Sequence, residues 1–326
     1  MKTIKWGILG PGRIAEKLAE AIQQSENGEL YAIGSRSAEK SADFAKRFGA
    51  SQSYSSYEEL CKDDKLDIIY IATPHSFHCE HSKLAMKYGR NVLCEKPFAL
   101  DAKEAQEMID CAKENGVFLM EAMWSRLLPG MTKVKELLAS HAIGQIKSMS
   151  GNFCFKSSPE AKPRLFDPKL GGGALLDVGI YPLTLACSFF GFPVNFNAKA
   201  DLTEQGVDAT SHYSLEFANG AKAELMSSVV QESEGEFVII GSQGEIIIHP
   251  KSWKLQSITL KNYDGEKTFD TAYEGSDYLL QVEEVQNCLN AGKVESEVNT
   301  FAWTYQMMEL MDSLRAKMGV KYNSEV

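Results

Sequence analysis

The sequence predicts an α/β domain followed by a second domain with an antiparallel or mixed sheet. Two patterns predict this division. Apolar strands and helical stretches alternate over the first 120 residues, as in a parallel sheet joined by right-handed crossovers. From Gln145 onward, strands dominate and pair with their neighbours in sequence. We therefore expect two domains, one at residues 1–122 and one at residues 123–326.

The elements of the first domain follow from the spacing of apolar residues. Ile14, Leu18, Ala21 and Ile22 recur at helical spacing, and three later helices are each followed by a glycine, a residue that ends helices well. We expect helices at 14–24, 38–48, 57–61, 78–88 and 102–115. We expect strands at 4–9, 30–35, 66–73, 91–95 and 117–122.

The second domain carries hairpin signals. Asn219 and Gly220 separate two alternating runs, 211–217 and 221–228, and Asn-Gly favours a tight hairpin turn. The runs 237–240 and 245–249 repeat this form. We expect helices at 131–140, 282–290 and 300–318.

Composition and charge limit the class of protein. The 326-residue chain is 44% hydrophobic and has a net charge of −10, which disfavours nucleic acid as a main partner. No apolar run is long enough to span a bilayer, and the first strand begins too early to leave room for a signal peptide. Seven scattered cysteines have no metal or redox spacing. We therefore expect reduced thiols, no membrane partner and a cytoplasmic protein.

A glycine turn follows the first strand and opens the first helix. Gly10-Pro11-Gly12-Arg13-Ile14-Ala15 is a GxGxxA pattern in the strand–turn–helix context that dinucleotide binding requires. Gly10 permits the tight turn, and Gly12 lets the backbone approach a pyrophosphate at the helix N-terminus. The alternative is a glycine turn that serves packing only.

The end of the second strand indicates which dinucleotide binds. NAD sites usually place a carboxylate there to bond the ribose 2′-hydroxyl, but this chain has Ser35-Arg36-Ser37 instead. A hydroxyl and a guanidinium suit a 2′-phosphate, and Arg13 and Lys40 would add positive potential. We therefore expect NADP. The alternative for Arg36 is a solvated surface charge.

The strand at 66–73 ends at Thr73-Pro74-His75, along the expected cofactor. His75, His78 and His81 are close in sequence, but the residues between them supply no further set of metal ligands. We expect these histidines to line or cap the cofactor cleft or to lie on a helix surface, and we expect no metal.

Glu95-Lys96-Pro97 closes the buried run at 91–94. A lysine at the carboxyl end of a strand in a nucleotide-binding sheet lies where substrate meets cofactor. We interpret Lys96 as catalytic, and the alternative is a solvated lysine that leaves a strand. Glu95 has two open roles, contact with the ligand or bracing of the strand end.

A second candidate site element begins at Gly171-Gly172-Gly173. Three glycines allow close backbone approach to a ligand before the chain enters a helix. Asp177 and Tyr181 are four residues apart and are expected to share one helix face. A carboxylate and a phenol near an amine form a plausible set for proton transfer. The alternative is that Tyr181 packs in the core.

Together these motifs resemble the Gfo/Idh/MocA family of oxidoreductases (glucose–fructose oxidoreductase / inositol 2-dehydrogenase). The resemblance covers essentially the whole chain. The motifs Glu121–Arg126 and Asp177–Tyr181 look most like the NADP-dependent dihydrodiol dehydrogenase / D-xylose 1-dehydrogenase branch. Many inositol-type members carry histidine at the position of Tyr181, which argues against an inositol substrate.

The resemblance implies a Rossmann domain plus an α+β domain with a large, open, predominantly antiparallel mixed sheet that commonly supports homodimers. It implies hydride transfer between the nicotinamide of NADP and a carbinol or carbonyl carbon of a sugar or diol. Lys96 would hydrogen-bond the reacting hydroxyl and lower the pKa of Tyr181, the general acid/base. Asp177 would hold a substrate hydroxyl, and Pro97 would shape the nicotinamide floor.

The expected site residues fall into three sets. The catalytic set is Lys96, Asp177 and Tyr181. The cofactor-binding set is Gly10, Gly12, Arg13, Ile14, Ser35, Arg36, Thr73, Pro74, His75, His78, Glu95, Lys96 and Pro97. The substrate-binding set is Trp124, Arg126, Arg164, Phe166, Asp177 and Tyr181. Phe153 and Phe155 have two open roles, lining the substrate cleft or core packing, and core packing is favoured. Trp253 and Trp303 are assigned to packing or an interface.

Two alternatives to a dehydrogenase stay open. A reductase of an anhydro-sugar or related ketone would use the same groups, because an acid and a base serve both directions. A non-catalytic NADP-binding regulator belongs to another class, and the presence of both Lys96 and Tyr181 argues against it.

Overall fold

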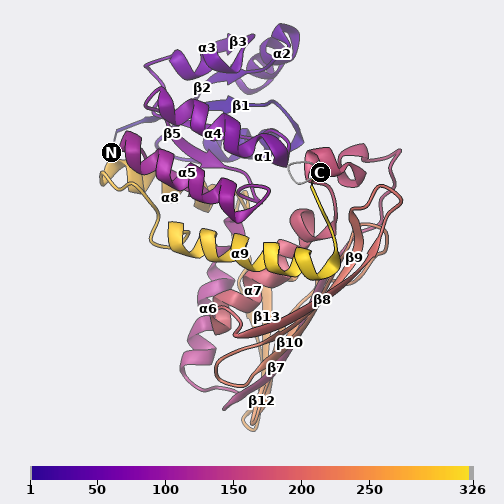
Figure 1. Cartoon of the computed structure of the whole chain (residues 1–326). Coiled ribbons are helices and arrows are strands. Elements are labelled where there is room, and N and C mark those ends of the chain that lie inside the picture. Colours follow the sequence, from indigo (N-terminus) through magenta and orange to yellow (C-terminus); the bar gives the residue numbers. More distant parts are fainter. Residues whose placement is uncertain (1, 323–326) are drawn as a thin grey trace. The chain divides into compact units, whose positions relative to one another are not determined.

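The computed structural model describes residues 2–322, and the chain forms two compact units (Figure 1). Unit 1 comprises the chain up to Trp124 together with Gly275–Met308. Unit 2 comprises Ser125–Glu274 and the chain from Glu309 onward. The first break lies two residues from the predicted boundary. The segment 275–308, which the sequence analysis assigns to the second domain, packs with unit 1 instead.

Unit 1 is built on a six-stranded parallel sheet in the order β3-β2-β1-β4-β5-β6. Strands β1 to β3 are added toward one edge of the sheet and β4 to β6 toward the other, so the strand order switches between β1 and β4. This is the doubly wound Rossmann arrangement. The strands are β1 (Ile4–Leu9), β2 (Gly28–Gly34), β3 (Gln52–Tyr54), β4 (Ile68–Ile71), β5 (Asn91–Cys94) and β6 (Leu119–Glu121). Only β3 is absent from the prediction, because its three residues are too few to show a pattern.

Three helices of unit 1 begin at a capping side chain, and two of them end at a glycine. The side chains of Ser37, Ser56 and Asp101 each accept a first-turn backbone N–H, and Gly49 and Gly116 end helices in the left-handed conformation. The helices are α1 (Arg13–Gln24), α2 (Ala38–Phe48), α3 (Tyr57–Lys62), α4 (His78–Lys87), α5 (Ala102–Asn115) and α8 (Leu279–Asn290).

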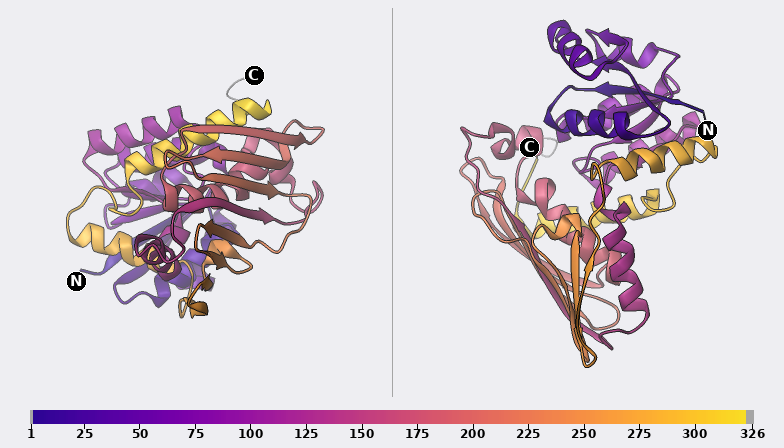
Figure 2. Two further views of the ribbon diagram at one scale, coloured as in Figure 1. Left: turned by 90° about the horizontal axis from the view of Figure 1, so that it is seen from below. Right: turned by 180° about the vertical axis from the view of Figure 1, so that it is seen from behind.

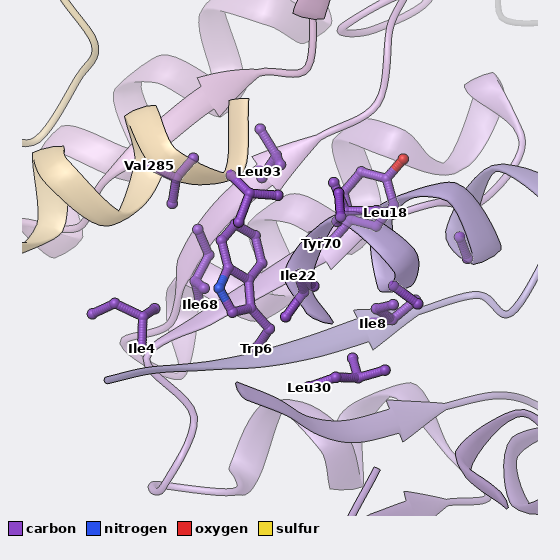
Figure 3. Close-up of a cluster of buried hydrophobic side chains, with 14 of the residues drawn as sticks. Ile4, Trp6, Ile8, Leu18, Ile22, Leu30, Ile68, Tyr70, Leu93 and Val285 are labelled. Atoms are coloured by element: carbon purple, nitrogen blue, oxygen red, sulfur yellow. The ribbon is translucent and has the colours of Figure 1, made fainter. Parts of the chain in front are cut away.

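A continuous apolar core explains why the late segment joins unit 1 (Figure 3). Trp6 is fully buried at its centre, among strand residues and α1. Val282 and Val285 of α8 complete this cluster with no exposed surface. Burial of a valine side chain is worth about 1.5–3 kcal/mol. This free energy of burial favours packing of α8 in unit 1, although the residues that precede it in sequence belong to unit 2.

Unit 2 contains an eight-stranded sheet in the order β14-β13-β12-β11-β7-β10-β9-β8. Only the β7–β10 pair is parallel. The hairpin predicted at Asn219-Gly220 joins β9 to β10, and a second predicted hairpin joins β11 to β12. The strands are β7 (Ile146–Cys154), β8 (Asn195–Leu202), β9 (Asp208–Glu216), β10 (Lys222–Ser228), β11 (Phe237–Gly241), β12 (Gly244–Ile248), β13 (Ser257–Asn262) and β14 (Gly265–Asp270).

Helices cover one face of this second sheet. Helices α6 (Pro129–Ala139) and α7 (Ile180–Phe190) lie on the same side, and the opposite face carries no helix of the described part of unit 2 (Figure 2). The last helix, α9 (Phe301–Met318), begins in unit 1 and ends in unit 2.

The apolar segment Pro168–Phe190 corrects one expectation from the sequence. By length and composition alone it is a helical stretch that could cross a membrane, with a mean hydropathy of 1.5. In the structure, 78% of its most apolar window is buried against the protein, as expected for the core helix of a folded domain. All seven cysteines lie in the described part of the chain, where each is buried and none forms a disulfide.

Candidate functional site

The register of the first sheet aligns the predicted cofactor residues along one edge. Gly34, Leu9, Ile71, Cys94 and Glu121 form one row of paired residues across five parallel strands. The next residue on each strand therefore stands at the carboxyl edge, where ligands bind in such sheets. These next residues are Ser35, Gly10, Ala72, Glu95 and Ala122.

The glycine turn has the geometry that its sequence predicts. Gly10 has φ +96°, and a Cβ atom there would lie 3.0 Å from the Thr73 methyl carbon. A Cβ atom on Gly12 would meet nothing within 4 Å. Gly10 is therefore required by the turn itself, whereas Gly12 leaves open space beside the backbone.

The open space at Gly12 fits a phosphate group. Gly12 is the N-cap of α1, and no side chain caps this helix terminus, so its first-turn N–H groups are available to an anion. Arg13 is exposed beside them. Because the turn is uncapped and unfilled, the residues present suit the pyrophosphate of a dinucleotide.

The end of β2 presents hydroxyl and cationic groups. Ser35 is buried and its hydroxyl accepts a bond from Ser37 N at 3.1 Å, which fixes the turn into α2. Arg36 and Lys40 are exposed. This donor set lacks a carboxylate and suits the 2′-phosphate of NADP.

The three histidines are buried, so the expectation that they could lie on a helix surface is wrong. The two ring nitrogens of His78 lie 2.8 Å from Pro97 O and 2.9 Å from Thr73 O. His81 Nδ1 lies 3.0 Å from the Thr73 hydroxyl. Burial, together with the charge of Arg36, lowers the pKa of His81 to about 4, so its ring is neutral at pH 7. His78 thus connects the segments that follow β4 and β5, and His81 connects α4 to the segment that follows β4.

Glu95 braces the loop that carries Lys96. Its side chain is 5% exposed and accepts hydrogen bonds from the Tyr70 hydroxyl and from Lys96 N, the latter at 3.1 Å. Burial raises the pKa of Glu95, while the Lys96 charge and these hydrogen bonds oppose the rise. The Lys96–Pro97 peptide bond is cis. Of the two roles left open for Glu95, the structure supports bracing.

A second buried carboxylate holds the other side of the same loop. Glu121 is 2% exposed, and its Oε1 accepts a bond from Phe98 N at 3.1 Å. Its Oε2 accepts a bond from the Thr304 hydroxyl at 3.1 Å. The Asn299 amide donates to the carbonyls of Glu121 and Met123 at 3.1 and 3.3 Å. The segment 275–308 therefore helps to fix the Lys96 loop within unit 1.

In unit 2, the glycine triplet approaches its own chain. A Cβ atom on Gly172 would lie 2.7 Å from Leu165 O. A Cβ atom on Gly173, which has φ +108°, would lie 2.1 Å from Asp208 Oδ1. The close approach predicted for a ligand is thus an approach to Leu165 and Asp208.

The helix that follows begins with a π-helical turn, Leu175–Gly179, which continues as α7. Such turns are frequent at functional sites. Asp177 lies within the π turn and Tyr181 at the start of α7. Arg164, in the 3-10 turn Pro163–Phe166, forms an ion pair with Asp177 at 2.5 Å. Two residues predicted separately to contact substrate therefore form one pair.

Aromatic side chains pack beside Tyr181. Phe153 lies 5.4 Å from the Tyr181 ring centre and stacks on Trp253 at 3.5 Å with an interplanar angle of 3°. Phe166 is buried in a small cluster with Val178. The packing role expected for Trp253 is confirmed, and Phe153 is half-buried between two rings.

Trp124 and Arg126 share the 3-10 turn Trp124–Leu127 but belong to different units. The Trp124 ring lies 5.3 Å from that of Tyr278 in unit 1. In unit 2, burial lowers the pKa of Lys135, and the charge of Arg126 adds to this effect.

Among the buried carboxylates, sequence reasoning identified Glu95 as a site residue but missed Glu121, Asp208 and the donors that lie far away in sequence. Glu121 sits in an apolar strand pattern, and an isolated glutamate inside such a run is the one signal that was available. Tyr70, Asn299, Thr304 and Asp208 carry no local signal, because their partners are distant in sequence.

Comparison with known protein families identifies both parts of the chain. Residues 4–123 match the model described as "Oxidoreductase family, NAD-binding Rossmann fold" of GFO/IDH/MocA. Residues 131–247 match the GFO/IDH/MocA C-terminal domain.

Curated relatives match over nearly the full chain. A trans-1,2-dihydrobenzene-1,2-diol dehydrogenase of Xenopus tropicalis is 32% identical, covering 98% of this chain and 99% of the relative. A scyllo-inositol 2-dehydrogenase (NADP(+)) of Bacillus subtilis is 32% identical, covering 99% of both. A D-xylose 1-dehydrogenase (NADP(+)) of Hypocrea jecorina is 30% identical, covering 98% and 93%.

A solved structure shares the fold. The 3-ketoreductase of Actinomadura kijaniata, in complex with NADP and TDP-benzene, superposes with a TM-score of 0.89 at 24% identity. The match covers 98% of this chain and 99% of that one. At this identity the likeness concerns the fold alone.

Tyr70→Phe tests the brace on the Lys96 loop. Loss of the donated hydrogen bond leaves the buried Glu95 carboxylate short of a donor, so Lys96 should be less well fixed. We expect kcat to fall about tenfold, because the net free energy of one hydrogen bond corresponds to a change in rate of about this size. The measurement is steady-state turnover on the best substrate.

The matched control is Tyr88→Phe, which removes a phenol–carboxylate bond to Glu58 at the protein surface. It should leave turnover unchanged. Equal rates for Tyr70→Phe and wild type would contradict a bracing role for Glu95.

Proposed function

The chain belongs to the GFO/IDH/MocA family of oxidoreductases, and on that premise we propose that it is an NADP-dependent dehydrogenase. It transfers hydride between the nicotinamide and a carbinol or carbonyl carbon of a sugar or diol. Relatives named as NADP-dependent dehydrogenases of diols, xylose and inositol support this assignment.

The observation that carries the proposal lies within unit 1. The uncapped helix terminus at Gly12 follows β1 and the braced loop at Lys96 follows β5, and these two strands share one row across the parallel sheet with β4 between them. A helix terminus that suits phosphate and a lysine on a braced loop therefore stand on the same edge of the sheet. This is the arrangement that places a reacting hydroxyl beside a dinucleotide.

The protein residues supply positioning and proton transfer. NADP, when bound, accepts or donates the hydride. In the oxidative direction the substrate hydroxyl must lose its proton as hydride leaves its carbon. We assign Lys96 to hydrogen-bond that oxygen and stabilise its developing negative charge, and Tyr181 to take the proton. Asp177, oriented by Arg164 at 2.5 Å, receives a second substrate hydroxyl.

The side chains near Tyr181 fit a polyol or diol. The Phe153–Trp253 stack offers an apolar ring surface, and the Asp177–Arg164 pair offers an acceptor and donors. Aromatic faces and paired polar groups together suit a sugar ring or a cyclic diol. The argument against an inositol substrate loses its force, because an inositol dehydrogenase is among the 32% identical relatives.

We further propose a cytoplasmic homodimer that joins through the helix-free face of the unit 2 sheet. Val238, Ile240 and Ile247 alternate with core residues and so point to this face, where Val238 pairs with Ile247. Ile240 is 44% exposed. On the same face, Lys222 and Glu224 of β10 carry opposite charges and are separated from Ile240 and Val238 by one strand, β7. An apolar strip with both signs of charge on the same face is suited to contact with a second copy.

Lys96→Ala and Tyr181→Phe test the mechanism. Purified protein is offered NADP with aldoses, diols and inositols, and nicotinamide absorbance reports turnover. We expect Lys96→Ala to abolish turnover and Tyr181→Phe to lower kcat about 10²–10⁴-fold, because both groups act on the moving proton. Lys103→Ala, an exposed lysine nearby, serves as the control. Wild-type rates in both variants would refute the mechanism, and NADP binding without any turnover would favour a non-catalytic regulator.

Arg36→Ala tests the cofactor assignment. Removal of a guanidinium from the 2′-phosphate should raise the KM for NADP about 10–100-fold and leave that for NAD unchanged. Lys46→Ala, at an exposed lysine of α2, the helix that follows Arg36, should change neither value. If wild type prefers NAD and Arg36→Ala changes nothing, the NADP assignment fails.

Ile240→Glu tests the dimer. A charge on the proposed contact strip should shift the protein from dimer to monomer in light scattering after size exclusion, because a buried unpaired carboxylate is costly. Val294→Glu, at a 49% exposed valine of unit 1, should leave the mass unchanged. A monomeric wild type, or a dimeric Ile240→Glu, would count against this interface.

A further inference from the structure

Asp208 is a buried carboxylate that contacts the start of another element, the helical segment that carries Asp177 and Tyr181. It is the first residue of β9 and has no exposed surface. Its Oδ2 accepts hydrogen bonds from Leu175 N at 2.6 Å and from the Ser211 hydroxyl at 2.7 Å. Leu175 opens the π turn, and the N-cap residue Ala174 has no side-chain cap of its own. A carboxylate 33 residues away therefore supplies the cap.

Glycine at position 173 makes this long-range cap possible. A Cβ atom at Gly173 would lie 2.1 Å from Asp208 Oδ1, and the glycine has φ +108°. An alanine there would therefore be strained and would displace the carboxylate. The third glycine of the triplet thus serves the contact with Asp208.

The far end of the π turn rests on the same strand. Tyr213 OH lies 2.7 Å from Ser227 Oγ, and a Cβ atom on Gly179 would lie 2.6 Å from that phenol oxygen. Asp208 and Tyr213 of β9 thus contact the π turn at its beginning and at its end. Asp177 lies between these two contacts, and Tyr181 lies two residues beyond the second.

We propose that Asp208 is a positioning residue that sets the geometry of Asp177 and Tyr181 by capping the π turn with its ionised carboxylate. The proposal rests on the assignment of those two residues to the reaction. Asp208 touches neither substrate nor cofactor in this role. It acts through Leu175 N, and an anion at a helix N-terminus is favoured by the helix dipole.

The charge state of Asp208 provides a readout that a purely structural residue would lack. Burial raises the pKa of Asp208 to about 6, and hydrogen bonds from Ser211 and Leu175 oppose this rise. The titratable groups coupled to it are the buried phenols of Tyr213 and Tyr322, whose own pKa values burial raises, so both are neutral. As pH falls through about 6, Asp208 gains a proton and the cap weakens, so kcat should fall.

The test compares Asp208→Asn and Ser211→Ala with wild type. Asp208→Asn keeps the size of the side chain but replaces one acceptor oxygen by a donor, so kcat should fall about tenfold. The decrease of kcat at low pH that depends on Asp208 should also disappear in this variant.

Ser211→Ala removes a hydrogen bond that lowers the pKa of Asp208, so in this variant the decrease of kcat should begin at a higher pH than in wild type. NADP affinity, which depends on unit 1, should change in neither variant. Glu216→Gln, at the other end of β9, serves as the control.

The outcomes separate this proposal from the proposed function. If Tyr181→Phe is inactive but Asp208→Asn and Ser211→Ala keep the wild-type kcat and pH profile, Asp208 is not a positioning residue. If Asp208→Asn only lowers the melting temperature, with turnover per folded molecule unchanged, its role is structural and the proposal is overturned. If Tyr181→Phe has wild-type rates, the proposed function itself fails. Should Asp208→Asn not fold, the shift in Ser211→Ala decides alone.

Discussion

Buried carboxylates that accept hydrogen bonds from loop amides hold the proposed reacting side chains in place. Glu95 accepts from Lys96 N, Glu121 from Phe98 N, and Asp208 from Leu175 N. Each carboxylate is at most 5% exposed. A charge-assisted bond in such surroundings is strong, and a buried amide left without an acceptor is costly. These loops therefore have few alternative conformations.

This constraint connects the fold to the chemistry. A parallel sheet brings its strand ends to one edge, but strand ends continue into loops, and loops are mobile by default. A side chain that stabilises a developing charge must be held before the reaction begins. Here the sheet supplies the edge, Tyr70 of β4 fixes Glu95, and Thr304 of α9 fixes Glu121. In unit 2, β9 gives the corresponding support to the π turn.

The sequence predicts those features whose cause is local. The glycine turn, the helix caps at Gly49 and Gly116, and the Asn219-Gly220 hairpin depend on neighbouring residues, and each has the expected conformation. Pairing of residues far apart in sequence is invisible to such reasoning. Phe98 and Glu121 are 23 residues apart, and Leu175 and Asp208 are 33 apart. The same limit applies to α8. Its valines indicate that one face of the helix is buried, but the sequence does not indicate which of the two sheets that face packs against.

Amide hydrogen exchange, measured residue by residue in the wild-type protein, tests the role of the buried carboxylates most directly. Phe98 and Leu175 lie outside the β-strands, so ordinary loop or helix-start amides in their places would exchange rapidly. Our account predicts that both exchange as slowly as the amides of the adjoining strands β5 and β9. Exchange at the rate of open loops, with the strands protected, would show that the carboxylates do not hold these segments, and would contradict the account.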